Sequence, residues 1–334
     1  MLSEHFNNVF LFSLDDKEML TGLSDGPLSS GSLLREKGKQ RCPEMRQTNT
    51  SLIIGADGVM GSALKKYLIS RKKKVIESTR RRNTCTTSRI FLDLSVEVDD
   101  EWTPPPDVSV AYLCAAVTSL EKCSTDPVQS AQVNVHNTVK LAKKCMEQGV
   151  FVIFPSTNLV FDGTVPFRKI HDDVSPRTEY GRQKAEAEKR LHSLGEDLAI
   201  VRFTKIIDPH LPLITRWLES LRSNHVIHPF SDYVMAPIPS SLAIECLYRI
   251  AKDRLRGIHH ISGPQDISYA DVAYHIAHRL NAEPNLVSSI KIGNSGVFLE
   301  HNPLHTTLDS TETGKKLGIK IPEALSSIDM VFFP

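Results

Sequence analysis

The chain has 334 residues, of which 40 are basic and 39 acidic, so it can form one large or two modest domains and its formal net charge is +1. Because the charge is nearly balanced, nothing in it points to nucleic acid or a membrane surface as a partner. Six cysteines without C-x-x-C spacing, and no apolar run of the length that a membrane span needs, predict a soluble cytoplasmic protein.

Residues 1–48 differ in composition from the rest of the chain. The run 24–32 is rich in turn-forming residues, and the run 33–46 is charged with little periodicity. Such a composition predicts a flexible N-terminal extension over residues 1–48. The alternative is that translation starts at Met45, just ahead of the first predicted strand.

From residue 50 to residue 204, apolar strands alternate with helical segments. Strands are predicted at 52–54, 74–79, 90–92, 108–114, 151–154 and 198–203, and helices at 59–70, 127–148 and 178–194. Since each strand is almost entirely apolar, the pattern predicts an α/β fold with a Rossmann-type doubly wound parallel sheet, covered by helices on both faces. Residues 49–204 would form this domain.

The alternation ends after Thr204, and residues 205–334 are predicted to form a smaller mixed α/β lobe. Prolines interrupt the segment 205–240, which is followed by a helix at 240–252, a strand at 257–261 and a helix that begins at Ser268 with capping-box spacing. Residues 160–177 are expected to contribute to this lobe. Ligands of doubly wound sheets bind at the carboxyl ends of the strands, so the lobe would close over that edge.

A glycine-rich turn joins the first strand to the first helix. Gly55, Gly58 and Gly61 have the spacing G-x-x-G-x-x-G. A strand that turns tightly into a helix directs backbone N–H groups and the positive helix N-terminus at one point, which suits a pyrophosphate. Plain tight turns also contain three glycines in seven residues, so the motif alone is a weak indication of a dinucleotide site.

A second motif lies on the helix after the fifth strand. Tyr180 and Lys184 are four residues apart and share one face of that helix. A phenol has a pKa near ~10, and a neighbouring ammonium is expected to lower that pKa toward the working range of a proton donor. A hydroxyl of Ser156 or Thr157 is placed to bind a carbonyl beside the tyrosine. Surface helices carry Y-x-x-x-K by chance, but its order after the glycine turn favours a carbonyl reductase.

From about residue 50 onward, the sequence resembles the extended short-chain dehydrogenase/reductase superfamily, and most closely its dTDP-4-dehydrorhamnose reductase branch. The matching pieces are the glycine turn, D-L at 93–94, C-A-A at 114–116, N-V at 134–135, S-T-N-L-V-F-D-G at 156–163, Y-G-R-Q-K at 180–184, H-I-S-G-P at 260–264 and L-D-S at 308–310. The resemblance implies an NAD(P)-dependent oxidoreductase that reduces a keto group, expected at C4, of a nucleotide-activated deoxysugar. It implies Tyr180 as the acid, Lys184 as its partner and Thr157 as the hydroxyl that orients the carbonyl.

The motifs and the resemblance together assign the binding residues. Cofactor contacts are expected from Tyr180 and Lys184 and from Gly55, Asp57, Gly58, Val59, Met60, Gly61, Thr79, Arg80, Arg81, Asp93, Leu94, Ala115 and Ala116. Substrate contacts are expected from Thr118, Asn158, Val160, Phe161 and Arg202. Asn134 either holds a water of the proton relay or caps a neighbouring backbone group.

The end of the second strand predicts NADPH in preference to NADH. Domains that select NAD place an acid there, about twenty residues past the glycines, where it repels a 2′-phosphate. Here that position is Thr79, and Arg80 and Arg81 follow it, which suits charge-assisted bonds to the phosphate. The competing interpretation makes Glu77 the ribose ligand, but Glu77 would have to act from within the strand.

Two other functions stay open beside the reductase. One is a nucleotide-sugar epimerase on the same scaffold, and the other is a non-catalytic NADP-binding regulatory subunit, like the beta subunit of methionine adenosyltransferase. The presence of both Tyr180 and Lys184 disfavours the non-catalytic regulatory subunit. A 4,6-dehydratase would need an acid and a base in place of Asn158 and Leu159.

The resemblance also implies a homodimer, formed by the helices 127–148 and 178–194. The apolar residues Val133, Val135, Val139 and Leu141 are equally explained by packing on the chain's own sheet. No metal site is predicted, because no carboxylate or thiol is arranged by sequence around His259, His260, His275 or His278.

Overall fold

The structure, a computed structural model, describes residues 50–334, so the predicted N-terminal extension lies outside the described residues. Its centre is a seven-stranded sheet with the strand order β10-β6-β5-β4-β1-β2-β3. The strands are β1 (Thr50–Ile54), β2 (Lys74–Thr79), β3 (Arg89–Phe91), β4 (Val108–Leu113), β5 (Phe151–Thr157), β6 (Leu198–Phe203) and β10 (Gly257–Ile261). All neighbouring strands run parallel, which confirms the predicted Rossmann-type doubly wound sheet.

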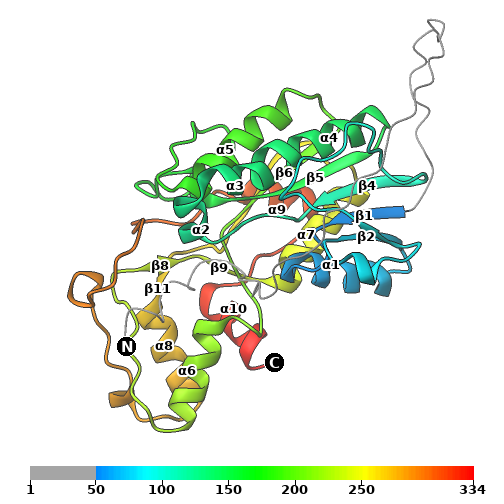
Figure 1. Ribbon diagram of the computed structural model, residues 1–334. Helices are drawn as coiled ribbons and strands as arrows, with labels where there is room; N and C mark the ends of the chain where they lie inside the picture. The colour runs from blue at the N-terminus through cyan, green and yellow to red at the C-terminus, as the bar shows by residue number, and fades with distance from the viewer. Residues whose placement is uncertain (1–49) are drawn as a thin grey trace, which may run out of the picture.

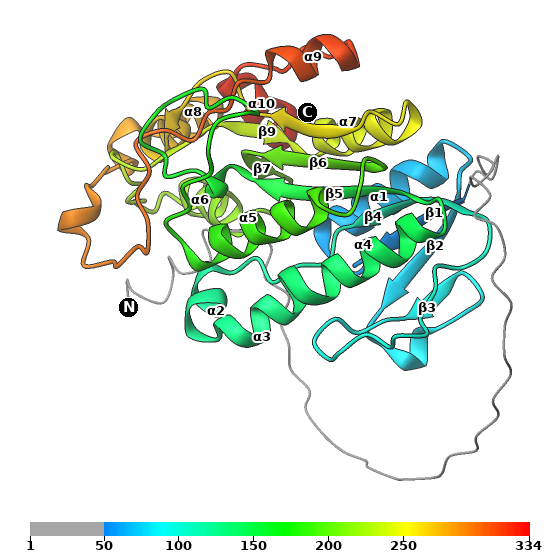
Figure 2. The ribbon, with the colours of Figure 1, turned by 90° about the horizontal axis from the view of Figure 1, so that it is seen from above.

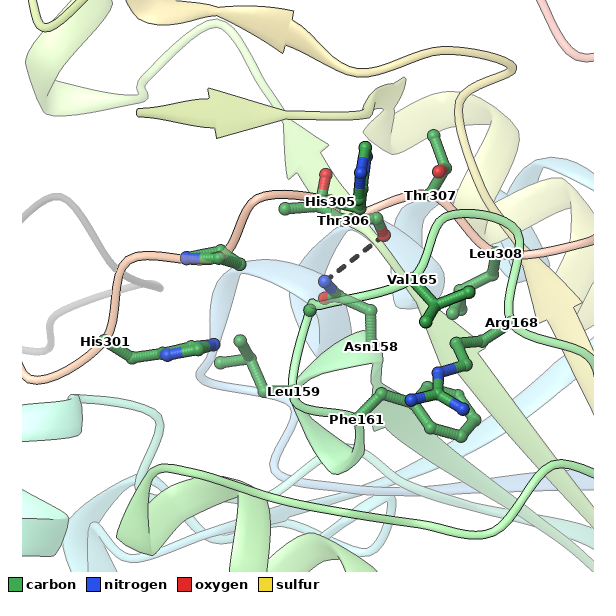
Figure 3. A pocket seen from close by; sticks show the side chains of 12 residues that line it. Asn158, Leu159, Phe161, Val165, Arg168, His301, His305, Thr306, Thr307 and Leu308 are labelled. Atoms are coloured by element: carbon green, nitrogen blue, oxygen red, sulfur yellow. Dashed lines mark hydrogen bonds between the residues drawn. The ribbon is translucent and has the colours of Figure 1, made fainter. Parts of the chain in front are cut away.

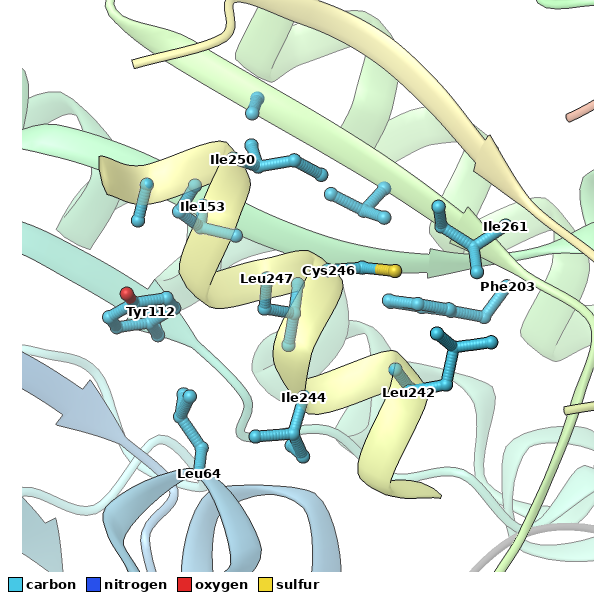
Figure 4. Close-up of a cluster of buried hydrophobic side chains, with 14 of the residues drawn as sticks. Leu64, Tyr112, Ile153, Phe203, Leu242, Ile244, Cys246, Leu247, Ile250 and Ile261 are labelled. Carbon is cyan, nitrogen blue, oxygen red and sulfur yellow. The ribbon is translucent and has the colours of Figure 1, made fainter. Parts of the chain in front are cut away.

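Helices cover both faces of this sheet, because its strands are apolar on both sides. Figure 1 shows α1 (Val59–Ser70) and α7 (Ser240–Lys252) on one face, and α4 (Thr138–Glu147) and α5 (Glu179–His192) on the other. On the first face, the apolar side of α7 packs into a fully buried cluster against the strands (Figure 4). No helix among residues 50–334 is long and apolar enough to cross a membrane.

The single helix predicted at 127–148 is divided into three segments. A π-helical stretch at Gln132–Asn137 joins α3 (Pro127–Ala131) to α4. The amide of Asn137 in this stretch accepts from the Val98 N–H at 3.2 Å and donates to the carbonyls of Leu94 and Val96. Such wide turns often occur at functional sites, and this one holds the loop after β3 against the helix.

The apolar stripe on this helical segment faces the chain's own sheet. Val135 and Leu141 are buried, and Val133 and Val139 pack against the core below α4 and α5. Exposed parts of the two helices carry charges, including the ion pairs Lys143–Glu147 and Arg190–Glu186. Packing on the sheet therefore accounts for the stripe, and the stripe no longer supports a dimer.

The segment 205–334 is shared between the sheet and a separate lobe. β10 pairs with β6 and α7 covers the sheet, so residue 204 is not a clean boundary. The lobe lies to one side of the sheet (Figures 1 and 2) and surrounds a second apolar core. Its elements are the helices α6 (Pro212–Arg222), α8 (Tyr269–Arg279) and α10 (Ala324–Phe332) and the strand pairs β7 (Lys205–Ile207) with β9 (Pro237–Pro239) and β8 (Val234–Met235) with β11 (Ile267–Ser268). The predicted capping box of Ser268 and Asp271 opens α8, but α6 and α10 were not predicted.

The loop after β5 lies against a C-terminal segment, residues 303–309. The Gly163 carbonyl accepts from the His305 N–H at 2.9 Å, and the Phe167 N–H donates to the Thr307 carbonyl at 3.1 Å. A short helix, α9 (Thr311–Leu317), follows this segment and contacts β10. Residues 160–177 thus lie beside the C-terminal part of the chain.

Candidate active site

The strand order reverses between β1 and β4, and the loops after these two strands meet there. Gly55 follows β1 with a φ of +90°, and a Cβ on it would lie 2.5 Å from the Ala115 nitrogen after β4. Only glycine allows this backbone conformation and this close approach. The glycine turn and the loop that begins at Ala115 therefore adjoin at the switch point, where doubly wound sheets bind their ligands.

The other two glycines of the turn serve different purposes. A Cβ on Gly61 would lie 2.2 Å from the Gly55 carbonyl oxygen, so Gly61 is needed for packing α1 on the turn. A Cβ on Gly58 would meet only that oxygen, at 3.4 Å, which is an ordinary contact. Gly58 opens α1 without a side-chain cap, and Val59 and Met60 follow it in a first turn that has no acidic residue. The packing of the fold therefore leaves room for a side chain at position 58. A phosphate that approaches the helix N-terminus needs that room, so a glycine here fits a dinucleotide site.

The end of β2 adjoins the glycine turn. The buried Thr79 hydroxyl donates to Asp57 Oδ2 at 2.7 Å and accepts from the Arg81 N–H at 3.1 Å. The side chains of Arg80 and Arg81 are exposed at this edge. The structure thus brings Asp57, Thr79 and the two arginines together beside the turn.

Glu77 is buried within β2 and is held by two cations. Its Oε1 lies 2.8 Å from Lys65 Nζ and 3.0 Å from Arg89 Nη1. Arg89 also forms an ion pair with Asp57, so it balances the one carboxylate of the glycine turn. These contacts occupy Oε1, while Oε2 of Glu77 is buried without a hydrogen-bond partner. Sequence reasoning missed Arg89, since only the pairing of Glu77 with Arg89 between β2 and β3 reveals their contact.

The loops after β3 and β4 are held by polar side chains. Asp93 Oδ1 accepts from the N–H and the hydroxyl of Ser95, so this carboxylate shapes the turn after β3, while Leu94 is buried in the core. The side-chain amide of Asn134 accepts from the Val117 N–H at 2.8 Å and donates to the Val117 carbonyl at 2.9 Å. The backbone-capping alternative for Asn134 is thus the one observed. Its contacts fix the loop of Ala115, Ala116 and the half-buried Thr118.

Tyr180 lies in the first turn of α5, where its ring packs against Leu120, Cys123 and Leu159. Burial raises the pKa of Tyr180 well above that of an ordinary phenol, and the Cys123 thiol acts in the same direction. The net shift of the Tyr180 pKa is therefore upward, and not downward as expected from the neighbouring Lys184. A phenol with a raised pKa stays protonated at neutral pH, although it is a weaker acid than an ordinary phenol.

Lys184 lies one turn further along α5 and is also buried. Its ammonium donates to the Pro155 carbonyl at 2.6 Å, and Nζ lies 3.7 Å from the centre of the Phe154 ring. Burial lowers the pKa of Lys184 to about 7, against the opposing effects of Glu188 and Cys114. Lys184 is therefore close to losing its charge at neutral pH.

Thr157 ends β5 and caps the short 3₁₀ turn Asn158–Val160. Its hydroxyl accepts from the Leu159 N–H at 3.2 Å. This turn packs directly on α5, because a Cβ on Gly181 would lie 2.2 Å from the Leu159 carbonyl oxygen. Thr157 and Tyr180 thus lie on adjoining turns. The alternative hydroxyl, that of Ser156, donates to Glu188 instead.

Apart from Thr118 on the loop after β4, the residues expected to contact substrate separate into two groups. Asn158 and Phe161 line a small pocket together with the segment 301–308, and the Asn158 amide donates to the Thr306 carbonyl at 3.3 Å (Figure 3). Val160, which was also expected to contact substrate, is 0% exposed and packs with Leu308 in the core. Arg202, expected in the same role, is 3% exposed and bonded to Glu188.

Two of the histidines weighed as metal ligands, His260 and His275, contact other side chains of the chain. His275 Nε2 lies 2.8 Å from Asp329 Oδ1, a carboxylate that sequence spacing did not reveal. Burial, together with Arg202, lowers the pKa of His260 to about 3, so its imidazole is neutral. No group of three histidine, cysteine or acidic residues within 50–334 is arranged to hold a metal.

A family model described as the RmlD substrate binding domain matches residues 49–332. A dTDP-4-dehydrorhamnose reductase from Aggregatibacter actinomycetemcomitans is 24% identical to this chain over 282 residues, which cover 80% of this chain and 93% of that protein. Methionine adenosyltransferase 2 subunit beta from Pongo abelii is also 24% identical, over 289 residues that cover 80% of this chain and 82% of that protein.

Solved structures share the fold. The dTDP-4-dehydrorhamnose reductase from Bacillus anthracis str. Ames, in complex with NADP, has a TM-score of 0.73 at 17% identity. The match covers 85% of this chain and 99% of that one. At this identity the likeness shows that both chains have the same architecture.

Proposed function

Because the chain belongs to the RmlD substrate-binding-domain family of sugar-nucleotide reductases, which are NAD(P)-dependent oxidoreductases of the extended short-chain type, we propose that it uses NADPH to reduce a keto group, at C4, of a nucleotide-activated deoxysugar. The observation that carries the proposal is the placement of Tyr180 and Lys184 on the buried face of α5, against the turn that Thr157 caps. This turn ends β5 at the same sheet edge as the glycine turn.

Each residue of this group has a distinct role in the proposed reaction. The bound cofactor supplies the hydride. Tyr180 holds a proton at neutral pH and donates it to the carbonyl oxygen, and Thr157 orients that oxygen. The Lys184 ammonium favours the phenolate that is left after proton transfer. Asn158 and Phe161 contact the sugar from the 3₁₀ turn and the loop that follows it.

The preference for NADPH rests on charge at the end of β2. Arg80 and Arg81 are exposed there, and Arg89 balances Asp57. An arginine binds a phosphate through charge-assisted, often bidentate hydrogen bonds. Glu77, which would disfavour a 2′-phosphate, is held inside the strand by Lys65 and Arg89. These contacts support a 2′-phosphate beside the turn.

The experiment is to measure NADPH consumption by the purified chain against a panel of 4-keto nucleotide sugars. We expect steady oxidation with at least one of them, and loss of turnover in Tyr180→Phe. Interconversion of 4-hydroxy nucleotide sugars without net NADPH consumption would identify an epimerase. Tight NADPH binding without turnover on any sugar would favour the non-catalytic subunit.

The homodimer stays a prediction that rests on the family resemblance alone, because the apolar stripe of the segment 133–141 packs on the chain's own core. Sedimentation at micromolar concentration tests it. A species of twice the chain mass is expected, and a monomer would reject the prediction.

A further inference from the structure

A buried ion pair lies one helical turn after Lys184 on α5. Arg202 on β6 donates to Glu188 on α5 through Nη2 at 2.7 Å and through Nε at 3.1 Å. The two side chains are only 4% and 6% exposed. A buried pair of this kind replaces lost hydration only when its geometry is good, and removal of one partner leaves an uncompensated charge.

This pair is joined to the end of β5 at the same place as Lys184. Ser156, which lies beside Arg202 in the β5–β6 register, donates its hydroxyl proton to Glu188 Oε1. Lys184, one helical turn before Glu188, donates to the carbonyl of Pro155, the residue before Ser156. Two successive turns of α5 thus hold two successive residues of β5, immediately before Thr157.

We propose that Glu188 is a positioning residue that keeps the Lys184 side chain charged and correctly placed for its work with Tyr180, and that Arg202 balances the charge of Glu188. The proposal rests on the proposed function, because it assigns Glu188 an effect on the Tyr180 and Lys184 pair. It also explains why Arg202, expected at the substrate, is buried instead.

Among residues 50–334, Glu188 is the carboxylate whose charge acts on Lys184, from one helical turn further along α5. The other neighbours are Cys114 just after β4, and the Phe154 ring and Pro155 carbonyl on β5. Burial raises the pKa of the Cys114 thiol to about 12, so it is neutral at physiological pH. Arg202, the partner of Glu188, also contacts His260: its Nη1 lies 3.3 Å from His260 Nε2, and this imidazole is neutral. The charge of Glu188 therefore opposes the effect of burial on Lys184.

Two substitutions change the charge next to Lys184 in opposite directions. Glu188→Gln leaves Arg202 unbalanced, so Lys184 should lose its proton at a lower pH. Arg202→Gln leaves Glu188 unbalanced, so Lys184 should lose its proton at a higher pH. The double variant restores neutrality and should titrate between the two. Glu186→Gln is the matched control, because Glu186 lies on the same helix and is paired with Arg190 at the surface.

The titration of Lys184 is followed by NMR in the cofactor-free protein with 13C-labelled lysine, assigned by comparison with Lys184→Met. The alkaline limb of kcat/KM is measured on the same variants. We expect shifts of roughly one pH unit, downward in Glu188→Gln and upward in Arg202→Gln, and none in Glu186→Gln. Circular dichroism checks the fold, and if one single variant does not fold, the other single variant is compared with the wild type and the double variant.

An unchanged Lys184 titration in the folded variants, or shifts of the same sign in both single variants, would overturn the positioning role. Opposite NMR shifts together with no reductase turnover in the wild type would support the positioning role while rejecting the proposed function. Reductase turnover in the wild type without any shift of the Lys184 titration would support the proposed function and reject the positioning role.

Discussion

Tyr180 and Lys184 share one buried face of α5, but burial affects their protonation in opposite ways. It disfavours the charged form of each group, so the pKa of the phenol rises and the pKa of the ammonium falls to about 7. In the free protein at neutral pH, Tyr180 therefore keeps its proton, and Lys184 is the group that titrates. For a reductase this places the proton on the donor before substrate binds.

The Tyr180→Phe variant removes the proposed acid and keeps the ring that packs against Leu159. We expect kcat to fall at least about 100-fold, with little change in the dissociation constant for NADPH. Steady-state assays measure kcat, and fluorescence titration measures the dissociation constant for NADPH. Tyr274→Phe, on the exposed face of α8, is the control and should keep full activity. Normal turnover in Tyr180→Phe would exclude the acid role.

The Arg80→Ala/Arg81→Ala variant removes two cations from the end of β2. We expect the preference for NADPH to weaken by about 30-fold or more, which corresponds to about 2 kcal/mol, because bonds to a charged phosphate are lost. Dissociation constants for NADPH and NADH on both proteins measure this. Arg222→Ala, at the end of α6, is the control. Tighter binding of NADH in the wild type, or an unchanged preference in the variant, contradicts the assignment.

At the scale of elements, the junction of β1 and α1 determines where a phosphate can bind. Gly61 allows α1 to pack on the turn, whereas Gly58 lies in an ordinary extended conformation with room for a side chain. One glycine therefore serves the fold, and the other serves the approach of a ligand to the helix N-terminus.

This distinction predicts different effects of alanine at the two positions. Gly58→Ala should weaken NADPH binding by about tenfold or more, or about 1.4 kcal/mol, with an almost unchanged Tm. Gly61→Ala should lower the free energy of unfolding by about 1–3 kcal/mol, because its Cβ would lie 2.2 Å from the Gly55 carbonyl oxygen. Thermal unfolding and cofactor titration of each variant give the comparison. A loss of stability in Gly58→Ala equal to that in Gly61→Ala would contradict it.

At the scale of the whole molecule, the packing of α5 on the sheet buries a group whose pKa is far from its ordinary value. Burial lowers the pKa of Lys184 in the folded chain to about 7, below the 10.5 of an exposed lysine. Between these values the unfolded chain binds more protons at this site than the folded chain. Stability from this group therefore rises with pH above 7.

Comparison of the wild type with Lys184→Met isolates this effect. From pH 7 to pH 8.5, the free energy of unfolding of the wild type should rise by about 1–2 kcal/mol more than that of the variant. Urea unfolding at several pH values measures the difference. Lys189→Met, on the exposed side of α5, should follow the wild type. Parallel curves for the wild type and Lys184→Met would show that Lys184 titrates normally.

The sequence alone determined the parallel sheet, its two covered faces, the glycine turn, and the shared helix face of Tyr180 and Lys184. These features depend on local patterns, because an apolar run predicts a buried strand and a spacing of four predicts one helix face. The spacing also contained a missed signal, since Glu188 continues the same face one turn after Lys184.

Only the tertiary structure decided which residues lie beside one another. The pairing of Arg202 with Glu188, the pairing of Arg89 with Glu77 and the burial of Val160 all depend on which strands and loops are neighbours. The same holds for β10, which lies far along the chain but completes the sheet beside β6. Such contacts join residues that are distant in sequence, so periodicity and spacing carry no record of them.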